Sequence, residues 1–90
     1  MMQRAKVVGD RLRRTRLALG FSQQVDFCSQ IDVDKGSYSH FESGKRPLTL
    51  RVAVKIKERW GVPLDWLYCG DKAQLSTDLY GKIIQIREAA

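Results

Sequence analysis

The chain has few of the residues from which metal sites and disulfide frameworks are built. Its 90 residues include two cysteines, Cys28 and Cys69, and one histidine. Two cysteines this far apart indicate neither a zinc site nor a disulfide framework, and they are typical of a reducing cytoplasm. No apolar run approaches the roughly 20 residues of a membrane-spanning helix, and the first nine residues lack the apolar core of a signal peptide. We therefore expect a cytoplasmic protein without a membrane partner.

The sequence also lacks the motifs of the common enzyme classes. It contains no clustered carboxylates outside the expected turns, no glycine-rich phosphate loop, and no serine, histidine and acid that are expected to converge. We therefore expect no catalytic residues, no metal and no cofactor, and no small-molecule ligand is evident.

Positive charge, in contrast, is abundant and unevenly distributed. Lysine and arginine number 16 against 10 aspartates and glutamates, which gives a formal net charge of +6. Residues 1–20 and residues 45–59 each hold six cations and one acid, whereas residues 21–34 hold three aspartates and no cation. Such flanking blocks are expected where they hold the phosphates of a nucleic acid and the segment between them faces the bases. The alternative is a basic surface that is simply solvated.

The hydrophobic pattern is helical along the chain, without a strand pattern or an internal repeat. Residues of one face recur at intervals of three or four in two segments, which are Val8, Leu12, Thr15 and Leu19, and then Leu50, Ala53, Ile56 and Trp60. They predict a helix over about 6–19 that Gly20 closes, and a helix that Thr49 caps and Gly61 ends. Pro63 begins a further short helix. Together with the pair described next, this predicts an all-α fold with five helices by about residue 68.

Residues 24–47 have the pattern of two short helices around a tight turn. Ser22 is expected to cap the first helix, in which two apolar residues four apart share one face. Asp32 lies where the chain must turn, because aspartate tolerates the left-handed conformation better than most residues other than glycine. Asp34 is expected to cap the second helix and Gly44 to end it.

The outer side of this second helix offers a cation, hydroxyls and an imidazole, from Lys35, Gly36, Ser37, Ser39 and His40. Tyr38 and Phe41 are expected on its buried side. A helix with little bulk near its N-terminus fits a major groove about 12 Å wide. The pair therefore has the shape of a helix-turn-helix reader of DNA, and a plain helical hairpin with a solvated polar face is the alternative.

Three stretches together resemble the phage repressor and Cro-type (XRE) helix-turn-helix family: RLRRTRLALGFSQQ, FCSQIDVDKGSYSHFESGKRP and VAVKIKERWGVPLDWLYCGD. The resemblance covers about residues 8–71, and its most specific parts are FESGKRP and GVPLDWLYCGD at the family's spacing. In that family the second helix of the pair lies in the major groove of an operator, and dimers bind two half-sites. The resemblance implies a compact five-helix repressor-like domain over residues 1–71.

The function that the resemblance implies is sequence-specific binding of double-stranded DNA by a transcriptional regulator, and in particular by a repressor of phage or bacterial promoters. The alternative is an antitoxin-like module that keeps the fold but binds another protein, with the last twenty residues as its partner-binding segment.

The resemblance also implies roles for individual residues. The base-facing positions are Lys35, Gly36, Ser37 and His40. Arg16 and Glu42 match an internal ion pair that ties the first helix to the end of the reading helix. Phosphate contacts fall to Gln24, to Lys45 and Arg46, and, in our interpretation, to Ser39 and Arg13. The connection before Gln24 is one residue longer than in the family pattern. Gln23 is therefore an alternative to Gln24 for the phosphate contact.

Two positions depart from the family pattern. Asp32 stands in the turn where the family prefers glycine, at a cost of about 1 kcal/mol if its conformation is left-handed. Gly36 occupies a base-facing site without a side chain, so recognition there must come from neighbours, from water or from a thymine methyl group.

The tail, residues 72–90, carries an apolar stripe of its own, formed by Leu75, Leu79, Ile83 and Ile86. Ser76 or Thr77 is expected to cap its helix. A short isolated helix with a glycine in its middle is marginal in water, so the stripe must be buried. We expect burial across the two-fold axis of a homodimer, which would space two reading helices at about 34 Å. The alternative is that the tail folds back on its own domain.

Overall fold

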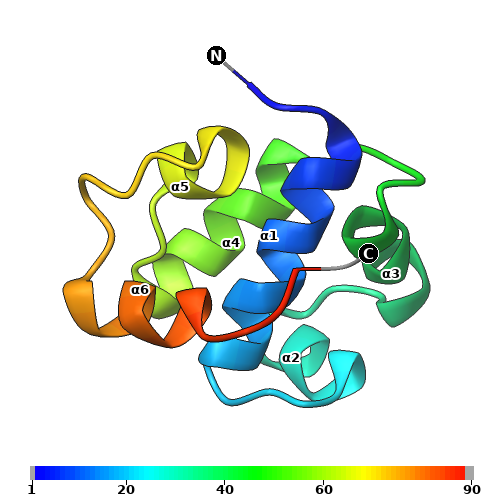
Figure 1. Ribbon diagram of the computed structural model, residues 1–90. Helices are drawn as coiled ribbons and strands as arrows, with labels where there is room; N and C mark the ends of the chain where they lie inside the picture. Colours follow the sequence, from blue (N-terminus) through cyan, green and yellow to red (C-terminus); the bar gives the residue numbers. More distant parts are fainter. Residues whose placement is uncertain (1, 89–90) are drawn as a thin grey trace.

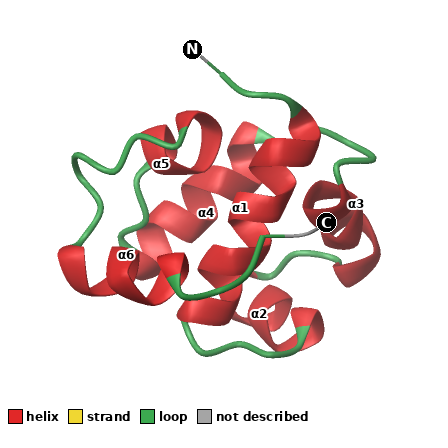
Figure 2. Cartoon of the chain, in the orientation of Figure 1, coloured by secondary structure: helices red, strands yellow, loops and turns green. Residues whose placement is uncertain are grey.

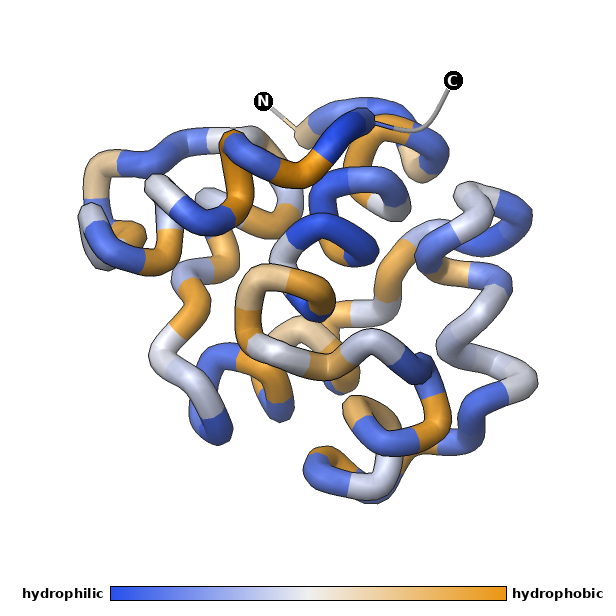
Figure 3. The backbone as a smooth tube through the Cα atoms, turned by 60° about the horizontal axis from the view of Figure 1, so that its bottom comes forward, coloured by the Kyte–Doolittle hydropathy of each residue, from blue (hydrophilic) through white to orange (hydrophobic). Residues whose placement is uncertain are grey.

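The computed structural model describes residues 2–88, and this part of the chain forms six helices and no strand (Figures 1 and 2). The helices are α1 (Ala5–Ala18), α2 (Gln24–Ile31), α3 (Lys35–Ser43), α4 (Leu50–Trp60), α5 (Leu64–Cys69) and α6 (Thr77–Ile84). The prediction of an all-α fold is confirmed. Along the helices, apolar and hydrophilic segments alternate (Figure 3), as expected for helices with one buried side.

Most helix ends lie where the local signals place them. The Asp34 side chain accepts a hydrogen bond from the Ser37 amide at 2.9 Å, and the Thr49 hydroxyl accepts one from the Val52 amide at 3.4 Å. Gly44 ends α3 with a left-handed φ of 79°. These caps satisfy amides and carbonyls that a helix end leaves without partners.

The start of α2 differs from the prediction that Ser22 caps it. The N-cap is Gln23, whose backbone is extended and whose side chain makes no capping hydrogen bond. The Ser22 carbonyl instead accepts a hydrogen bond from the Arg16 guanidinium at 3.1 Å. This contact holds the connection outside the helix, so α2 begins one residue later than a Ser22 cap would require.

Aromatic rings form the centre of the core between α2, α3 and α4. Phe27 stacks on Trp60 with their ring centroids 4.6 Å apart, and Tyr38 lies 5.4 Å from Phe27. Trp66 of α5 belongs to another part of the core, where its indole donates to the Thr15 hydroxyl of α1 at 3.1 Å. Rings of this size contribute much of the apolar area that a small domain buries.

Helix α1 packs closely against α3 because Gly9 has no side chain. A Cβ atom at Gly9 would lie 2.3 Å from the Phe41 carbonyl oxygen and 2.5 Å from that of Glu42. The backbone of α1 therefore approaches the carbonyl end of α3 directly, and any larger residue would push the two helices apart.

The tail folds back on its own domain, where α6 packs against α1 (Figure 1). Leu75 is 8% exposed and Ile83 is 0% exposed, and both belong to the core, against which Leu79 packs half-buried. Ile86 is also half-buried. The prediction that this stripe is buried across a dimer axis is therefore wrong for Leu75 and Ile83, because the chain itself already covers their side chains.

Candidate nucleic-acid interface

The turn between α2 and α3 has the left-handed residue that the sequence predicts. Asp32 adopts φ 52° and ψ 55°, and it is the single non-glycine residue with positive φ among residues 2–88. The Val33 amide then donates to the Cys28 carbonyl at 3.1 Å, which closes the end of α2. Asp34 begins α3 directly afterwards, so the two helices form a helix-turn-helix pair.

The side of α3 that faces away from the core carries the predicted base-facing positions. Lys35 and Gly36 are exposed, and Ser37, Ser39 and His40 are half-buried, whereas Tyr38 and Phe41 are buried on the opposite side. The Ser39 hydroxyl donates to the Gly36 carbonyl at 2.9 Å. This side of the helix offers hydrogen-bonding groups and one cation to a ligand.

Gly36 has a local structural reason to lack a side chain. A Cβ atom there would lie 3.1 Å from the Asp34 carboxylate oxygen that caps α3. A larger residue would crowd this cap. The missing side chain therefore keeps the N-terminus of α3 both well capped and open.

The reading helix is braced from behind by a buried ion pair. The Arg16 guanidinium donates to the two Glu42 carboxylate oxygens at 2.7 and 3.1 Å, and the two side chains are 7% and 5% exposed. The Gln24 side-chain amide donates to the same carboxylate at 3.0 Å. Glu42 thus joins α1, α2 and α3. Gln24 braces α3, whereas Gln23 is exposed at the helix start.

Burial and the Glu42 carboxylate together shift the pKa values of groups in this region. Burial alone would lower the pKa of Arg16, but its hydrogen bonds to Glu42 and the negative charge of that carboxylate outweigh burial and raise the pKa. Burial, together with the nearby Glu42 carboxylate, raises the pKa of Tyr38 well above its usual value. Burial also raises the pKa of Cys28 to about 11, and its side chain is 2% exposed and packs in the core.

Lys45 and Arg46 lie in the loop after α3, and both are exposed. The Arg46 amide donates to the His40 carbonyl at 3.1 Å, which ties the loop to α3. Two cations therefore stand at a fixed place beside the exposed side of the reading helix.

Arg13, a predicted phosphate contact, already has two acceptors within the chain. Its guanidinium donates to the Asp10 carboxylate of α1 at 3.2 Å and to the Arg87 carbonyl after α6 at 2.6 Å. The structure therefore groups Arg13 with the C-terminal segment, because two acceptors there already engage it. A phosphate would have to compete with both.

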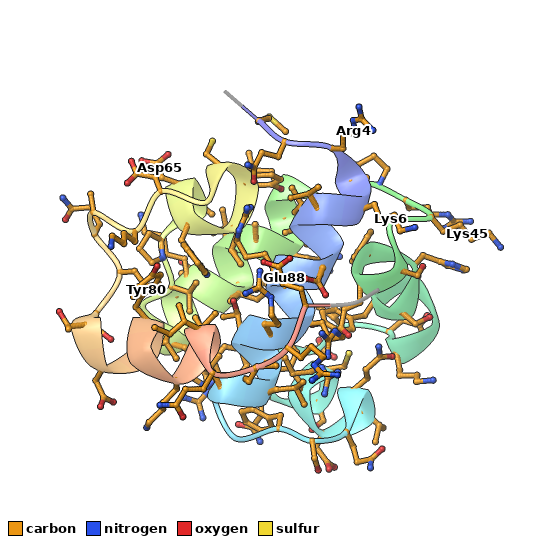
Figure 4. All side chains as sticks on the ribbon, viewed as in Figure 1. Arg4, Lys6, Lys45, Asp65, Tyr80 and Glu88 are labelled. Atoms are coloured by element: carbon orange, nitrogen blue, oxygen red, sulfur yellow. The ribbon has the colours of Figure 1, made fainter. Side chains whose placement is uncertain are left out.

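Two further cations, Arg4 and Lys6, were not among the predicted site residues. The backbone of Lys6 abuts the loop after α3, since a Cβ atom at Gly44 would lie 2.6 Å from the Lys6 Cα. In Figure 4, Arg4, Lys6 and Lys45 lie on the same edge of the molecule. One indication of these two residues was present in the sequence. Arg4 and Lys6 lie at the start of a helix, where a positive charge opposes the helix dipole and does not stabilise the helix.

The described residues offer little for other kinds of site. Among residues 2–88, no group of three or more histidine, cysteine, aspartate and glutamate side chains is placed to hold a metal ion. None of the helices described is long and apolar enough to cross a membrane.

Comparisons with known proteins agree with this geometry. A helix-turn-helix family model matches residues 12–67, which is more than half of the chain. The chain is 33% identical over 72 residues to a prophage SPbeta-derived HTH-type transcriptional regulator, YonR, of Bacillus subtilis; the match covers 78% of this chain and 64% of the relative. It is 35% identical over 60 residues to the control protein C.MunI of a Mycoplasma species, covering 67% of this chain and 81% of the relative.

The match thus spans slightly less than two thirds of the length of the Bacillus relative. No solved structure matches the chain. The family match covers all of α2, α3 and α4, the left-handed turn at Asp32 and the loop that carries Lys45 and Arg46. Because the family model matches more than half of the chain, and the structure has the helix pair, the chain belongs to the XRE-type helix-turn-helix family.

Proposed function

We propose that this chain is a transcriptional regulator that binds double-stranded DNA operators by their sequence and represses the promoters in which they lie. The observation that carries the proposal is the exposed side of α3, which presents Lys35, Ser37 and His40 beside the loop cations Lys45 and Arg46. The relatives, one a prophage-derived regulator and the other a control protein, support a regulatory role.

In this proposal α3 lies in the major groove with its N-terminal residues toward the base edges. A lysine at position 35 suits the two acceptors of guanine, and the bare backbone at Gly36 admits a thymine methyl group. The loop cations and Lys6 hold the phosphates on the flanks, where they fix the register of the protein on the duplex. Gln23 and Ser39 are further candidates for phosphate contacts.

A homodimer on two half-sites is part of the same proposal. One short reading helix contacts only a few base pairs, so two copies on a two-fold symmetric operator supply the affinity that a specific site needs. The surface that joins the copies is not the buried part of the tail stripe. The protein-binding alternative assigned the tail to another protein, but Leu75 and Ile83 of that tail are already buried within the chain.

Selection of bound sites from a random duplex library tests the function itself. We expect one short sequence to emerge, with two inverted half-sites about one helical turn apart. Equal competition by the selected duplex and by random DNA would refute sequence-specific binding.

Lys35 and Arg46 should differ in how their loss affects binding. Lys35→Ala is expected to weaken binding to the selected site by about 1 to 3 kcal/mol and to relax the preference at one position, because a base contact carries sequence information. Arg46→Ala is expected to weaken binding to selected and random duplexes alike, because a phosphate contact does not. Gel-shift titrations of both variants on both duplexes make the comparison. Parallel losses on the two duplexes for Lys35→Ala would remove it from the base-reading set.

Binding should also depend steeply on salt. Each neutralised phosphate releases condensed counterions, so the logarithm of the association constant should fall linearly with the logarithm of salt concentration, by about 0.9 per phosphate. Because Lys6, Lys45 and Arg46 are exposed, we expect a slope that corresponds to several phosphate contacts per subunit. Fluorescence anisotropy between low and physiological salt measures it. A flat dependence would speak against a phosphate-binding surface.

A further inference from the structure

The carbonyl end of α2 carries a cation from another helix. The Lys55 ammonium of α4 donates to the carbonyl oxygens of Ile31 and Asp32 at 3.1 and 3.3 Å. Ile31 is the last residue of α2, and Asp32 is its left-handed cap. These two hydrogen bonds therefore connect α4 to the turn at the centre of the helix-turn-helix pair.

This position needs a cation that α2 does not supply. The last carbonyls of a helix have no partner within it, and the negative end of the helix dipole favours a positive charge. Helix α2 has no basic residue in its last turn. Lys55, more than twenty residues away in the sequence, supplies both the hydrogen-bond donor and the positive charge at this helix end.

The same contact restrains a conformation that is unfavourable by itself. A non-glycine residue in the left-handed region costs about 1 kcal/mol or more and persists only where its surroundings hold it. A lysine bound to the carbonyl of Asp32 resists rotation of the peptide group that follows this residue. That peptide group leads directly into Val33 and the cap of α3, so its orientation sets the angle between α2 and α3.

We propose that Lys55 is a positioning residue for DNA reading, which holds the left-handed turn and thereby fixes α3 relative to α2. This inference rests on the proposed function, because α3 is the reading helix. Its charge alone would have grouped Lys55 with phosphate contacts of the second basic block, whereas the geometry directs its ammonium at the protein backbone. Lys57 of the same helix is exposed and provides the contrast.

The test compares Lys55→Met with Lys57→Met in the full chain. Both variants lose one positive charge and keep a long apolar stem, so their general electrostatic effects match. We expect Lys55→Met to lower the ratio of affinities for selected and random duplexes by about tenfold, which corresponds to about 1.4 kcal/mol. Lys57→Met should leave this ratio unchanged. Lys55→Arg should restore it, because a guanidinium also donates to two carbonyls.

A second measurement reports on the turn without DNA. Hydrogen exchange of the Val33 amide, which bonds to Cys28, should become about tenfold faster in Lys55→Met, an effect of about 1.4 kcal/mol on local opening. The buried Leu12 amide of α1 serves as the reference for global unfolding. Unchanged exchange of Val33 relative to Leu12 would overturn the inference, as would faster exchange with an unchanged affinity ratio. A wild-type protein without preference for any duplex would refute the proposed function instead, and the exchange data would still decide whether Lys55 holds the turn.

Discussion

Replacing Glu42 by alanine is expected to lower the free energy of unfolding by about 3 to 5 kcal/mol, because removal of one partner leaves the buried Arg16 charge uncompensated. The carboxylate also accepts from Gln24, so three helices lose a common contact. Urea denaturation followed by circular dichroism measures the change. Glu88→Ala is the control, since that carboxylate is 76% exposed and lies 3.8 Å from Arg14. Its loss should be small in comparison.

A double variant separates the buried charge from the lost contact. Replacing Arg16 and Glu42 together by methionine and leucine removes both charges and keeps apolar volume, so it should cost less than Glu42→Ala alone. If Glu42→Ala unfolds at nearly the same urea concentration as the wild type, the pair does not brace the reading helix in solution.

Replacing Ile83 by alanine is expected to cost about 2 to 5 kcal/mol, because it leaves a cavity where the tail meets α1. Ile83 is 0% exposed, whereas its neighbour Ile84 is 58% exposed. Ile84→Ala is therefore a matched control on the same helix, and it should change stability far less. Thermal unfolding of both variants at two protein concentrations measures the difference.

The concentration dependence distinguishes packing within the chain from packing between two copies. Burial within one chain predicts that Ile83→Ala lowers the unfolding temperature by the same amount at both protein concentrations, even where the copies associate through another surface, whereas a stripe buried between copies predicts a loss that shrinks on dilution. A larger loss for Ile84 than for Ile83, together with such a dependence on dilution, would place the tail at an interface.

The local features of the fold could be predicted from the sequence because each depends on residues close together in the chain. The cap at Asp34, the left-handed turn at Asp32 and the stop at Gly44 follow from the chemistry of single side chains. The Arg16–Glu42 pair could not be derived from periodicity. Resemblance to a family implied this pair, and in the structure Nε of Arg16 lies 2.7 Å from Oε2 of Glu42.

The location of the tail could not be predicted for a physical reason. A periodic apolar stripe predicts that one side of a helix is buried, but it does not predict which surface covers that side. The stripe of the tail consists of Leu75, Leu79, Ile83 and Ile86. The surface of α1 that receives it lies near the other end of the sequence. Similarly, Lys55 and Lys6 look like ordinary surface cations until the fold brings them to the end of α2 and to the loop at Gly44.

Arg13 remains a predicted phosphate contact, but its charge alone did not indicate its partners within the chain. It belongs to a basic block and was therefore expected at a phosphate, yet Asp10 lies three residues before it on the same helix. Side chains at this spacing meet on a helix surface, so the sequence did contain a competing partner. The second acceptor, the carbonyl of Arg87, depends on the fold of the tail and had no local signal.

The two tryptophans give the molecule two separate optical reporters. Trp60 stacks on Phe27 behind the helix-turn-helix pair, whereas Trp66 donates to Thr15 and packs edge-on against Tyr80 of α6. The emission of an indole responds to the polarity and hydrogen bonding of its surroundings. With the other tryptophan replaced by phenylalanine, fluorescence from Trp60 follows the reading unit, and fluorescence from Trp66 follows the attachment of the tail. Loosening of one half of this small protein can therefore be observed while the other half stays folded.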